Sequence, residues 1–92
     1  PAIGPLSFEV GPEVADQFYA RGSEFRAAFK ARENTDRLLC DLYMICRLQL
    51  IKAGVCECFG GDYDTFTDKR FFSYRRSRIC GRQAGVVLTA CA

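Results

Sequence analysis

The sequence contains no histidine and no tryptophan, and it has only one methionine and three prolines. Without histidine, a Cys–His nucleophile cannot be built within the chain, and a closed zinc site would need cysteines alone. No apolar run approaches the roughly 20 residues of a membrane-spanning helix. The chain begins at Pro1 without a basic-then-apolar leader. We therefore expect a soluble protein of the cytoplasm.

Strong charge of one sign is also missing, because thirteen basic and eleven acidic residues leave a net charge of +2. That balance does not indicate a nucleic-acid partner by itself. With 92 residues, 49% of them hydrophobic and 26% charged, the composition is that of one small globular domain.

Cysteine, in contrast, is abundant. The six cysteines are Cys40, Cys46, Cys56, Cys58, Cys80 and Cys91. An even number in a short chain is compatible with a disulfide framework, and whether any are bonded stays open. We favour simple packing over a cysteine-only zinc site, because no CxxC pair occurs and two of the six lie in an apolar run.

The N-terminal third predicts one extended piece and two helices. Ser7–Val10 is the extended piece. Gly11-Pro12 then starts a helix over Pro12–Tyr19, with proline at the first helical position and Glu13 in the first turn. After Gly22, Ser23 is expected to cap a second helix that reaches Ala31.

The longest periodic segment predicts a helix over Arg37–Ala53, capped by Thr35 or Asp36 and ended by Gly54. Its expected buried stripe consists of Leu39, Leu42, Tyr43, Cys46, Leu50 and Ala53. The rest of the chain predicts three strands, at Val55–Phe59, Phe71–Arg76 and Ala84–Thr89. Helices followed by strands favour an α+β fold with a layered mixed sheet and helices.

Most of the available chemistry lies in the segment KRFFSYRRSRICGR, residues 69–82, where six basic residues alternate with aromatic ones. In an extended strand, Ser73 and Arg75 share one face, and Phe72, Tyr74 and Arg76 share the other. A hydroxyl beside a guanidinium suits a phosphate group. A solvated or salt-bridged face is the plainer alternative, and binding of single-stranded nucleic acid is a weaker one.

The acidic loop before this segment is less informative. Gly60-Gly61-Asp62 lacks the spacing of a phosphate-binding loop, and an ordinary turn explains it better. Asp62, Asp64 and Asp68 lack the spacing of a calcium-binding loop.

Three runs of the sequence resemble the YfiH-like, laccase-domain family, which is also described as multicopper polyphenol oxidase-like. They are GPLSFEVGPEV (residues 4–14), LLCDLYMICRLQLIKAGV (38–55) and FGGDYDTFTDKRFFSYRRSRICGRQAGVV (59–87). The family often has Cys where this sequence has Asp64, and Thr where it has Cys80. The resemblance covers the whole chain and implies that residues 1–92 are one partial domain, the C-terminal part of a YfiH-like fold.

The resemblance implies an enzyme about two and a half times this length. It would be a zinc-dependent purine nucleoside phosphorylase (a transferase) and adenosine deaminase (a hydrolase), described in older work as a copper-dependent polyphenol oxidase or laccase. Its metal ligands, two histidines and a cysteine, lie upstream of the matched region. None can be carried over, so we expect no catalytic residue and no metal or cofactor on this chain alone.

The expected role of the chain is binding of phosphate or substrate near the zinc by Ser73, Arg75, Arg76 and Arg82, with Phe72 and Tyr74 packing beside them. Arg75 and Arg76 cannot both face one pocket on a regular strand, so at least one should be structural. The alternative is a non-catalytic structural or interaction module that docks on the missing N-terminal part of the domain or on a second copy. Membrane binding is not expected, and nucleic acid is the less favoured partner.

Overall fold

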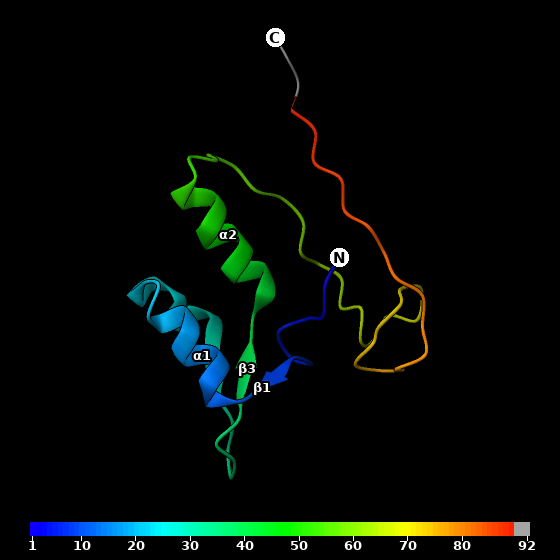
Figure 1. The fold of residues 1–92 in the computed structure, drawn as a ribbon, viewed down its shortest axis with the longest axis horizontal. Coiled ribbons are helices and arrows are strands. Elements are labelled where there is room, and N and C mark those ends of the chain that lie inside the picture. The colour runs from blue at the N-terminus through cyan, green and yellow to red at the C-terminus, as the bar shows by residue number, and fades with distance from the viewer. Residues whose placement is uncertain (90–92) are drawn as a thin grey trace.

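The computed structural model describes residues 1–89. Helices and short strands occupy the first part of the chain (Figure 1). In order they are β1 (Glu9–Val10), α1 (Pro12–Tyr19), the 3-10 helix η1 (Ser23–Ala28), β2 (Phe29–Ala31), β3 (Leu38–Cys40) and α2 (Leu42–Lys52).

The three strands form one small antiparallel sheet with β3 in the centre, in the order β1-β3-β2. Val10 pairs with Leu38 on one side of β3, and Phe29 pairs with Cys40 on the other. This confirms an α+β fold in its coarse form, a small set of helices with a small antiparallel sheet.

Helix α1 is confirmed with the predicted bounds, because its start is encoded locally. Pro12 occupies the first helical position and Glu13 lies in the first turn. The second predicted helix, Ser23–Ala31, is wrong in its last turn. The chain forms a 3-10 helix only as far as Ala28, and Gly22 rather than Ser23 is its N-cap. Residues 29–31 pair with β3 instead, because a strand partner is available.

The prediction for the long helix is right at its end and wrong at its start. Residues 38–40 are the central strand, and Asp41 caps α2 by accepting a hydrogen bond from Met44 N at 3.0 Å. Neither Thr35 nor Asp36 has that role. At the other end Gly54 has φ +95°. Val55 N donates to the Leu50 carbonyl at 3.0 Å, the six-to-one bond of a Schellman motif.

The core lies between the sheet and the helices. Its buried members are Val10, Ala15, Phe25, Ala28, Phe29, Cys40 and Ile45. On α2 the buried residue is Ile45, whereas Cys46 is exposed. The sequence therefore predicted the wrong buried face for this helix. Most residues of α2 are apolar, so the sequence pattern does not single out one face.

Residues 55–89 contain no strand or helix beyond an isolated bridge from Ala2 to Asp64. The three predicted strands at Val55–Phe59, Phe71–Arg76 and Ala84–Thr89 are therefore wrong for this chain, since these segments find no neighbour to pair with among residues 1–89. The Cα radius of gyration is 14.8 Å, against about 12 Å for a compact domain of this length. Figure 1 shows the cause, a long segment that leaves the body.

Candidate functional site

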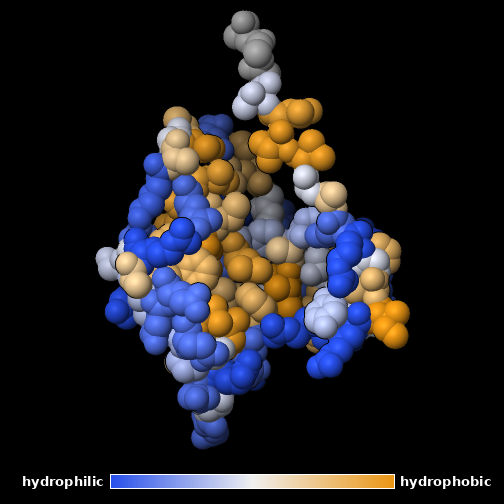
Figure 2. Space-filling model, in the orientation of Figure 1, coloured by the Kyte–Doolittle hydropathy of each residue, from blue (hydrophilic) through white to orange (hydrophobic). Residues whose placement is uncertain are grey.

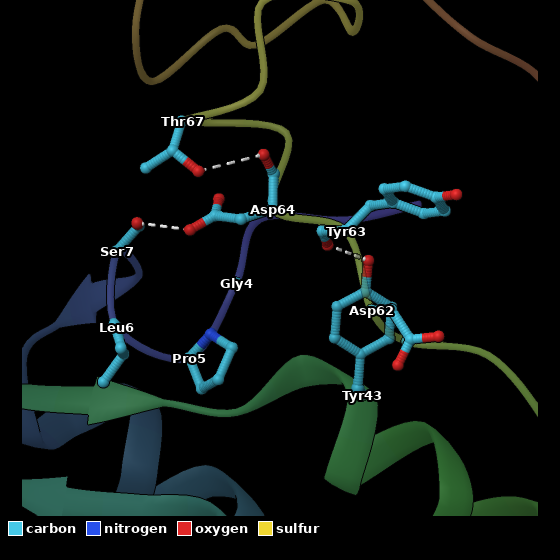
Figure 3. Close-up of a pocket in the computed structure, with 10 residues that line it drawn as sticks. Gly4, Pro5, Leu6, Ser7, Tyr43, Asp62, Tyr63, Asp64 and Thr67 are labelled. Atoms are coloured by element: carbon cyan, nitrogen blue, oxygen red, sulfur yellow. Dashed lines mark hydrogen bonds between the residues drawn. The ribbon is translucent and has the colours of Figure 1, made fainter.

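The loop of residues 61–76 is fastened to the N-terminal segment, and Asp64 makes much of the link (Figure 3). Ser7 Oγ donates to Asp64 Oδ2 at 2.5 Å, and Phe66 N donates to Asp64 Oδ1 at 2.9 Å. Ala2 pairs with Asp64 as a parallel bridge. Ala2 and Ser7 of the N-terminal segment thus hold Asp64 and its loop on the body.

Gly4 allows this close approach, because a Cβ atom at that position would lie 2.7 Å from Asp64 Cγ. Partial burial is the largest single influence on the Asp64 carboxyl and raises its pKa. Hydrogen bonds from Ser7 and from the amides of Gly4, Phe66 and Thr67 outweigh it, so the pKa is lowered overall. Asp64 therefore acts as a charged acceptor that ties two segments together.

Tyr43 of α2 adds a second link. Its hydroxyl accepts a hydrogen bond from Ala2 N at 2.8 Å and lies 2.5 Å from the Tyr63 carbonyl, to which it donates. A cleft of about 320 Å³ opens beside these links, and it is lined by Gly4, Pro5, Leu6, Ser7, Tyr43, Gly61, Asp62, Tyr63, Asp64 and Thr67. Sequence reasoning missed this cleft, because its residues come from three segments that are far apart along the chain.

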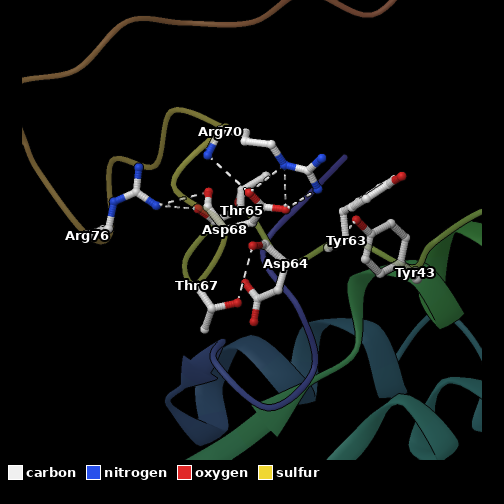
Figure 4. Close-up of polar contacts among 8 residues, drawn as sticks. All are labelled: Tyr43, Tyr63, Asp64, Thr65, Thr67, Asp68, Arg70 and Arg76. Carbon is white, nitrogen blue, oxygen red and sulfur yellow. Dashed lines mark hydrogen bonds and ion pairs between the residues drawn. The ribbon is translucent and has the colours of Figure 1, made fainter.

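Arg76 holds the shape of the loop from inside (Figure 4). Its Nη1 donates to the carbonyls of Thr65, Phe66 and Asp68 at 2.8, 3.1 and 3.3 Å. Its Nη2 donates to the Phe71 carbonyl at 2.6 Å. The guanidinium is thus occupied by four backbone oxygens of its own loop, which makes Arg76 a structural residue here.

Asp68 and Arg70 form a bidentate pair on the outside of the same loop, with Nη2 to Oδ2 at 2.7 Å and Nε to Oδ1 at 3.0 Å. The hydrogen bond from Arg70 is the main cause that lowers the pKa of the Asp68 carboxyl to about 2. Because Arg70 is exposed, this pair is screened by solvent and adds little to stability.

A different cleft, of about 270 Å³, brings together four of the predicted site residues. It is lined by Ile3, Phe8, Thr65, Phe72, Ser73, Tyr74 and Arg75. Ser73 is 6% exposed. Its Oγ accepts a hydrogen bond from Arg76 N at 3.3 Å, which leaves the hydroxyl proton available as a donor.

Arg75 lies against the first strand. Its guanidinium stands 5.1 Å from the centre of the Phe8 ring, and Nη1 donates to the Glu9 carbonyl at 3.0 Å. A guanidinium has five N–H donors, so this bond leaves others for an anion. A serine hydroxyl and an arginine on one cleft can bind a phosphate or carboxylate group.

The remaining predicted residues lie at the outer end of the segment. Arg82 stands over the Tyr74 ring at 5.3 Å, and Nη1 lies 3.3 Å from Cys80 Sγ. Phe72 packs on Gly81, where a Cβ atom would lie 2.6 Å from the ring. Arg82 does not line the cleft that contains Ser73 and Arg75.

The alternation argument behind these predictions is wrong, because residues 74–76 form a turn rather than a strand. Phe72 and Tyr74 therefore line the same cleft as Ser73 and Arg75. Arg76 points to the loop carbonyls instead.

The cysteines do not form a metal centre in the described part of the chain. Cys40, Cys46, Cys56, Cys58 and Cys80 are free. Among residues 1–89, no group of three Cys, Asp or Glu side chains is placed to hold a metal ion. The donors present therefore do not fit zinc or copper. Cys91 lies outside the described residues.

Cys40 belongs to the core instead. Burial, together with the neighbouring charge of Asp41, raises the pKa of its thiol to about 11. Separately, no helix among residues 1–89 combines the length and apolar character needed to cross a membrane.

Comparison with known proteins gives consistent results. A family model described as multi-copper polyphenol oxidoreductase laccase matches residues 1–90. The purine nucleoside phosphorylase PA4543 of Pseudomonas aeruginosa is 48% identical over 88 residues, which are 95% of this chain and 36% of that protein. The purine nucleoside phosphorylase YfiH of Escherichia coli K12 is 44% identical over 88 residues, 95% of this chain and 35% of that protein.

Among solved structures, Neisseria meningitidis protein NMB0706 of the DUF152 family superposes with a TM-score of 0.77 at 40% identity, over 83% of this chain and 31% of that one. The chain spans about a third of the length of the curated relatives it matches. With a family model over nearly its whole length and these relatives beside it, the chain belongs to the multi-copper polyphenol oxidoreductase laccase family, together with the YfiH-type purine nucleoside phosphorylases.

Proposed function

We propose that these 92 residues work as the C-terminal part of a longer YfiH-like domain that cleaves purine nucleosides with phosphate. The names of the relatives support this reaction, and the length of the relatives supports the longer domain. In that domain the small antiparallel sheet is part of a larger, layered mixed sheet, and the helices pack against it.

The observation that carries the proposal is the cleft that contains Ser73 and Arg75. We assign it to phosphate, with the Ser73 hydroxyl and the free N–H groups of Arg75 as donors. Phe72 and Tyr74 border the cleft. Arg82, which stands over Tyr74, adds positive charge nearby.

In this proposal, the residues that bind zinc lie outside this chain. The same holds for copper, the metal to which the family's laccase name points. The donors among residues 1–89 do not fit such an ion, so no step is assigned to it here. Deamination of adenosine by the same longer domain is a further part of the proposal, as is a location in the cytoplasm.

The experiment uses a full-length chimera in which these 92 residues replace the matching stretch of the P. aeruginosa relative. Phosphorolysis of inosine is measured against phosphate concentration, and ammonia release from adenosine is measured in parallel. Arg75→Ala should raise the KM for phosphate about tenfold or more, since a charge-assisted bond is lost. The exposed Arg78, changed to Ala, is the matched control and should leave KM unchanged.

Unchanged phosphorolysis in both Arg75→Ala and Arg76→Ala would remove this segment from the phosphate site. A chimera that folds and contains metal but cleaves no purine nucleoside would contradict the proposed reaction.

The second candidate is a non-catalytic module that docks on the rest of the domain or on a second copy. Large exposed apolar side chains favour it, among them Leu6, Phe59 and Ile79. Metal analysis and turnover of the 92-residue chain alone separate the two. Stoichiometric zinc with turnover would rule out the module, whereas a metal-free, inactive chain that binds its complement would support it.

A further inference from the structure

The buried polar residues among residues 1–89 are Thr65 and Ser73, and each is 6% exposed. Both line the cleft that also contains Arg75. In Figure 2 hydrophilic side chains lie instead on the outer surface, also over this loop at the right of the view. Burying a hydroxyl group costs free energy unless the group is hydrogen-bonded. Two buried hydroxyls on one cleft therefore indicate a polar ligand.

The backbone of Thr65, rather than its side chain, holds this residue in place. Its N–H donates to the Ala2 carbonyl at 3.0 Å, and its carbonyl accepts a hydrogen bond from Arg76 Nη1 at 2.8 Å (Figure 4). No hydrogen bond joins the Thr65 hydroxyl to another group of residues 1–89.

The Thr65 hydroxyl is nevertheless not sealed in the interior. In the part of the chain that the structure describes, the sealed side-chain oxygen without a partner is Glu24 Oε1. The Thr65 hydroxyl therefore reaches solvent, and this residue meets solvent at the cleft that it lines. A free hydroxyl at the wall of a cleft is a donor that a ligand can use.

Arg76 fixes the two hydroxyl residues relative to each other. Its backbone N–H donates to Ser73 Oγ at 3.3 Å, and its guanidinium holds the Thr65 carbonyl. The bond to Ser73 uses an acceptor site of the hydroxyl and leaves its proton free. One residue thus places two hydroxyl donors that come from different parts of the loop.

We propose that Thr65 is a third phosphate-binding residue, which donates its hydroxyl proton to a phosphate oxygen beside Ser73 and Arg75, and that Arg76 is the positioning residue for both hydroxyls. This inference rests on the phosphate site proposed above. Phosphate has several acceptor oxygens, and hydroxyl and guanidinium groups both donate to such an anion. Bound phosphate supplies the Thr65 hydroxyl with the partner that residues 1–89 do not provide.

Kinetics of the chimera described above test the role of Thr65. Thr65→Val should raise the KM for phosphate about tenfold, the loss typical of a hydrogen bond to a charged group. The KM for inosine should stay unchanged, and Thr65→Ser should retain the phosphate KM of the unsubstituted chimera. Thr67→Val is the matched control, because its exposed hydroxyl lies on the same loop but not at this cleft.

Stability without phosphate separates binding from a structural role. Thr65→Val should not lower the Tm of the chimera, because its hydroxyl has no hydrogen bond within residues 1–89 to lose. A lower Tm with an unchanged KM for phosphate would overturn the proposal and make the hydroxyl structural. If Thr65→Val does not fold, Thr65→Ala also lacks the hydroxyl and should raise the KM for phosphate by a similar factor.

A double-mutant cycle tests the positioning role of Arg76. Arg76→Ala should raise the KM for phosphate although its guanidinium does not line the cleft. In the Thr65→Val background the same substitution should have a smaller effect, because one of the two positioned donors is already absent. Effects that multiply fully would overturn the positioning role.

Inorganic phosphate as a ligand distinguishes this inference from the proposed reaction. Phosphate should raise the Tm of the chimera, and it should do so less in Thr65→Val. That result in a chimera without phosphorolysis would contradict only the proposed reaction. An active chimera whose KM for phosphate depends on Arg75 but not on Thr65 would contradict only the role of Thr65.

Discussion

Arg76 Nη1 lies 2.8 Å from the carbonyl oxygen of Thr65, eleven residues earlier in the chain, and donates a hydrogen bond to it. The same guanidinium reaches Phe66, Asp68 and Phe71, so one side chain closes a loop that has no regular secondary structure. Its neighbour Arg75 turns the other way, to the Glu9 carbonyl. Two adjacent arginines of one motif thus have separate positions and separate expected roles.

Removing the Arg76 guanidinium should loosen this loop. We expect Arg76→Ala to lower the free energy of unfolding by about 1–2 kcal/mol, because hydrogen bonds from a charged donor to partly exposed carbonyls are lost. Urea unfolding measures this, and limited proteolysis should show new cleavage between residues 65 and 71. Arg78→Ala is the control and should change neither. If Arg76→Ala leaves the proteolysis pattern unaltered, the loop does not depend on the hydrogen bonds of the Arg76 guanidinium.

Gly4 should tolerate no side chain while Asp64 keeps its place. Gly4→Ala brings a Cβ atom to 2.7 Å from Asp64 Cγ. We expect a loss of about 1–3 kcal/mol in the free energy of unfolding. In Gly4→Ala/Asp64→Ala the two losses should be less than additive, because the second substitution removes Asp64 Cγ and Oδ2 from the clash and leaves only Cβ, at 2.8 Å. Gly85→Ala meets open space and should be neutral. Strict additivity would place the two residues out of contact.

Stability should fall in acid partly through Asp64. Its folded pKa lies below the ordinary value, so its contribution is fully present above about pH 4, the unfolded pKa. The contribution is lost as pH falls through the folded pKa. We expect Asp64→Asn to flatten the decline of Tm below about pH 4. Asp68→Asn should change the decline little, because the pair of Asp68 with the exposed Arg70 is screened by solvent. Parallel Tm curves for wild type and Asp64→Asn would contradict the role of this carboxylate.

The cysteines should react in two classes. Cys40 is buried and its thiol pKa is raised to about 11, whereas Cys46, Cys56 and Cys58 are exposed. At pH 8 a maleimide should modify the three exposed thiols at least tenfold faster than Cys40, which should react only on unfolding. Peptide mass spectrometry after timed labelling measures each rate. Modification of Cys40 at the rate of Cys56 would show that β3 is not protected.

The cap of α2 provides a test of helix stability. Asp41 Oδ1 accepts a hydrogen bond from Met44 N, so Asp41→Ala should cost about 1 kcal/mol in the free energy of unfolding. Asp41→Ser keeps an acceptor and should recover most of that loss. Asp36→Ala, at the position that the sequence also suggested as a cap, should be nearly neutral. Equal losses for Asp36→Ala and Asp41→Ala would show that the helix starts earlier than Leu42.

Local signals in the sequence were sufficient for several features. Pro12 placed the start of α1 and Gly54 the end of α2, because both act through their own backbone geometry. The motif at residues 71–76 and the run that follows it identified the family. They also named Ser73 and Arg75, which share a cleft.

Tertiary structure decided what depends on distant partners. Residues 38–40 have a helical pattern but pair as the central strand, since β1 and β2 supply hydrogen bonds on both sides. The tail at residues 84–89 has a strand pattern but lacks a partner among residues 1–89. The directions of Arg75 and Arg76 follow from a turn that packs on the N-terminal segment. A strand needs a neighbour and a loop needs a surface, and neither is encoded within the segment itself.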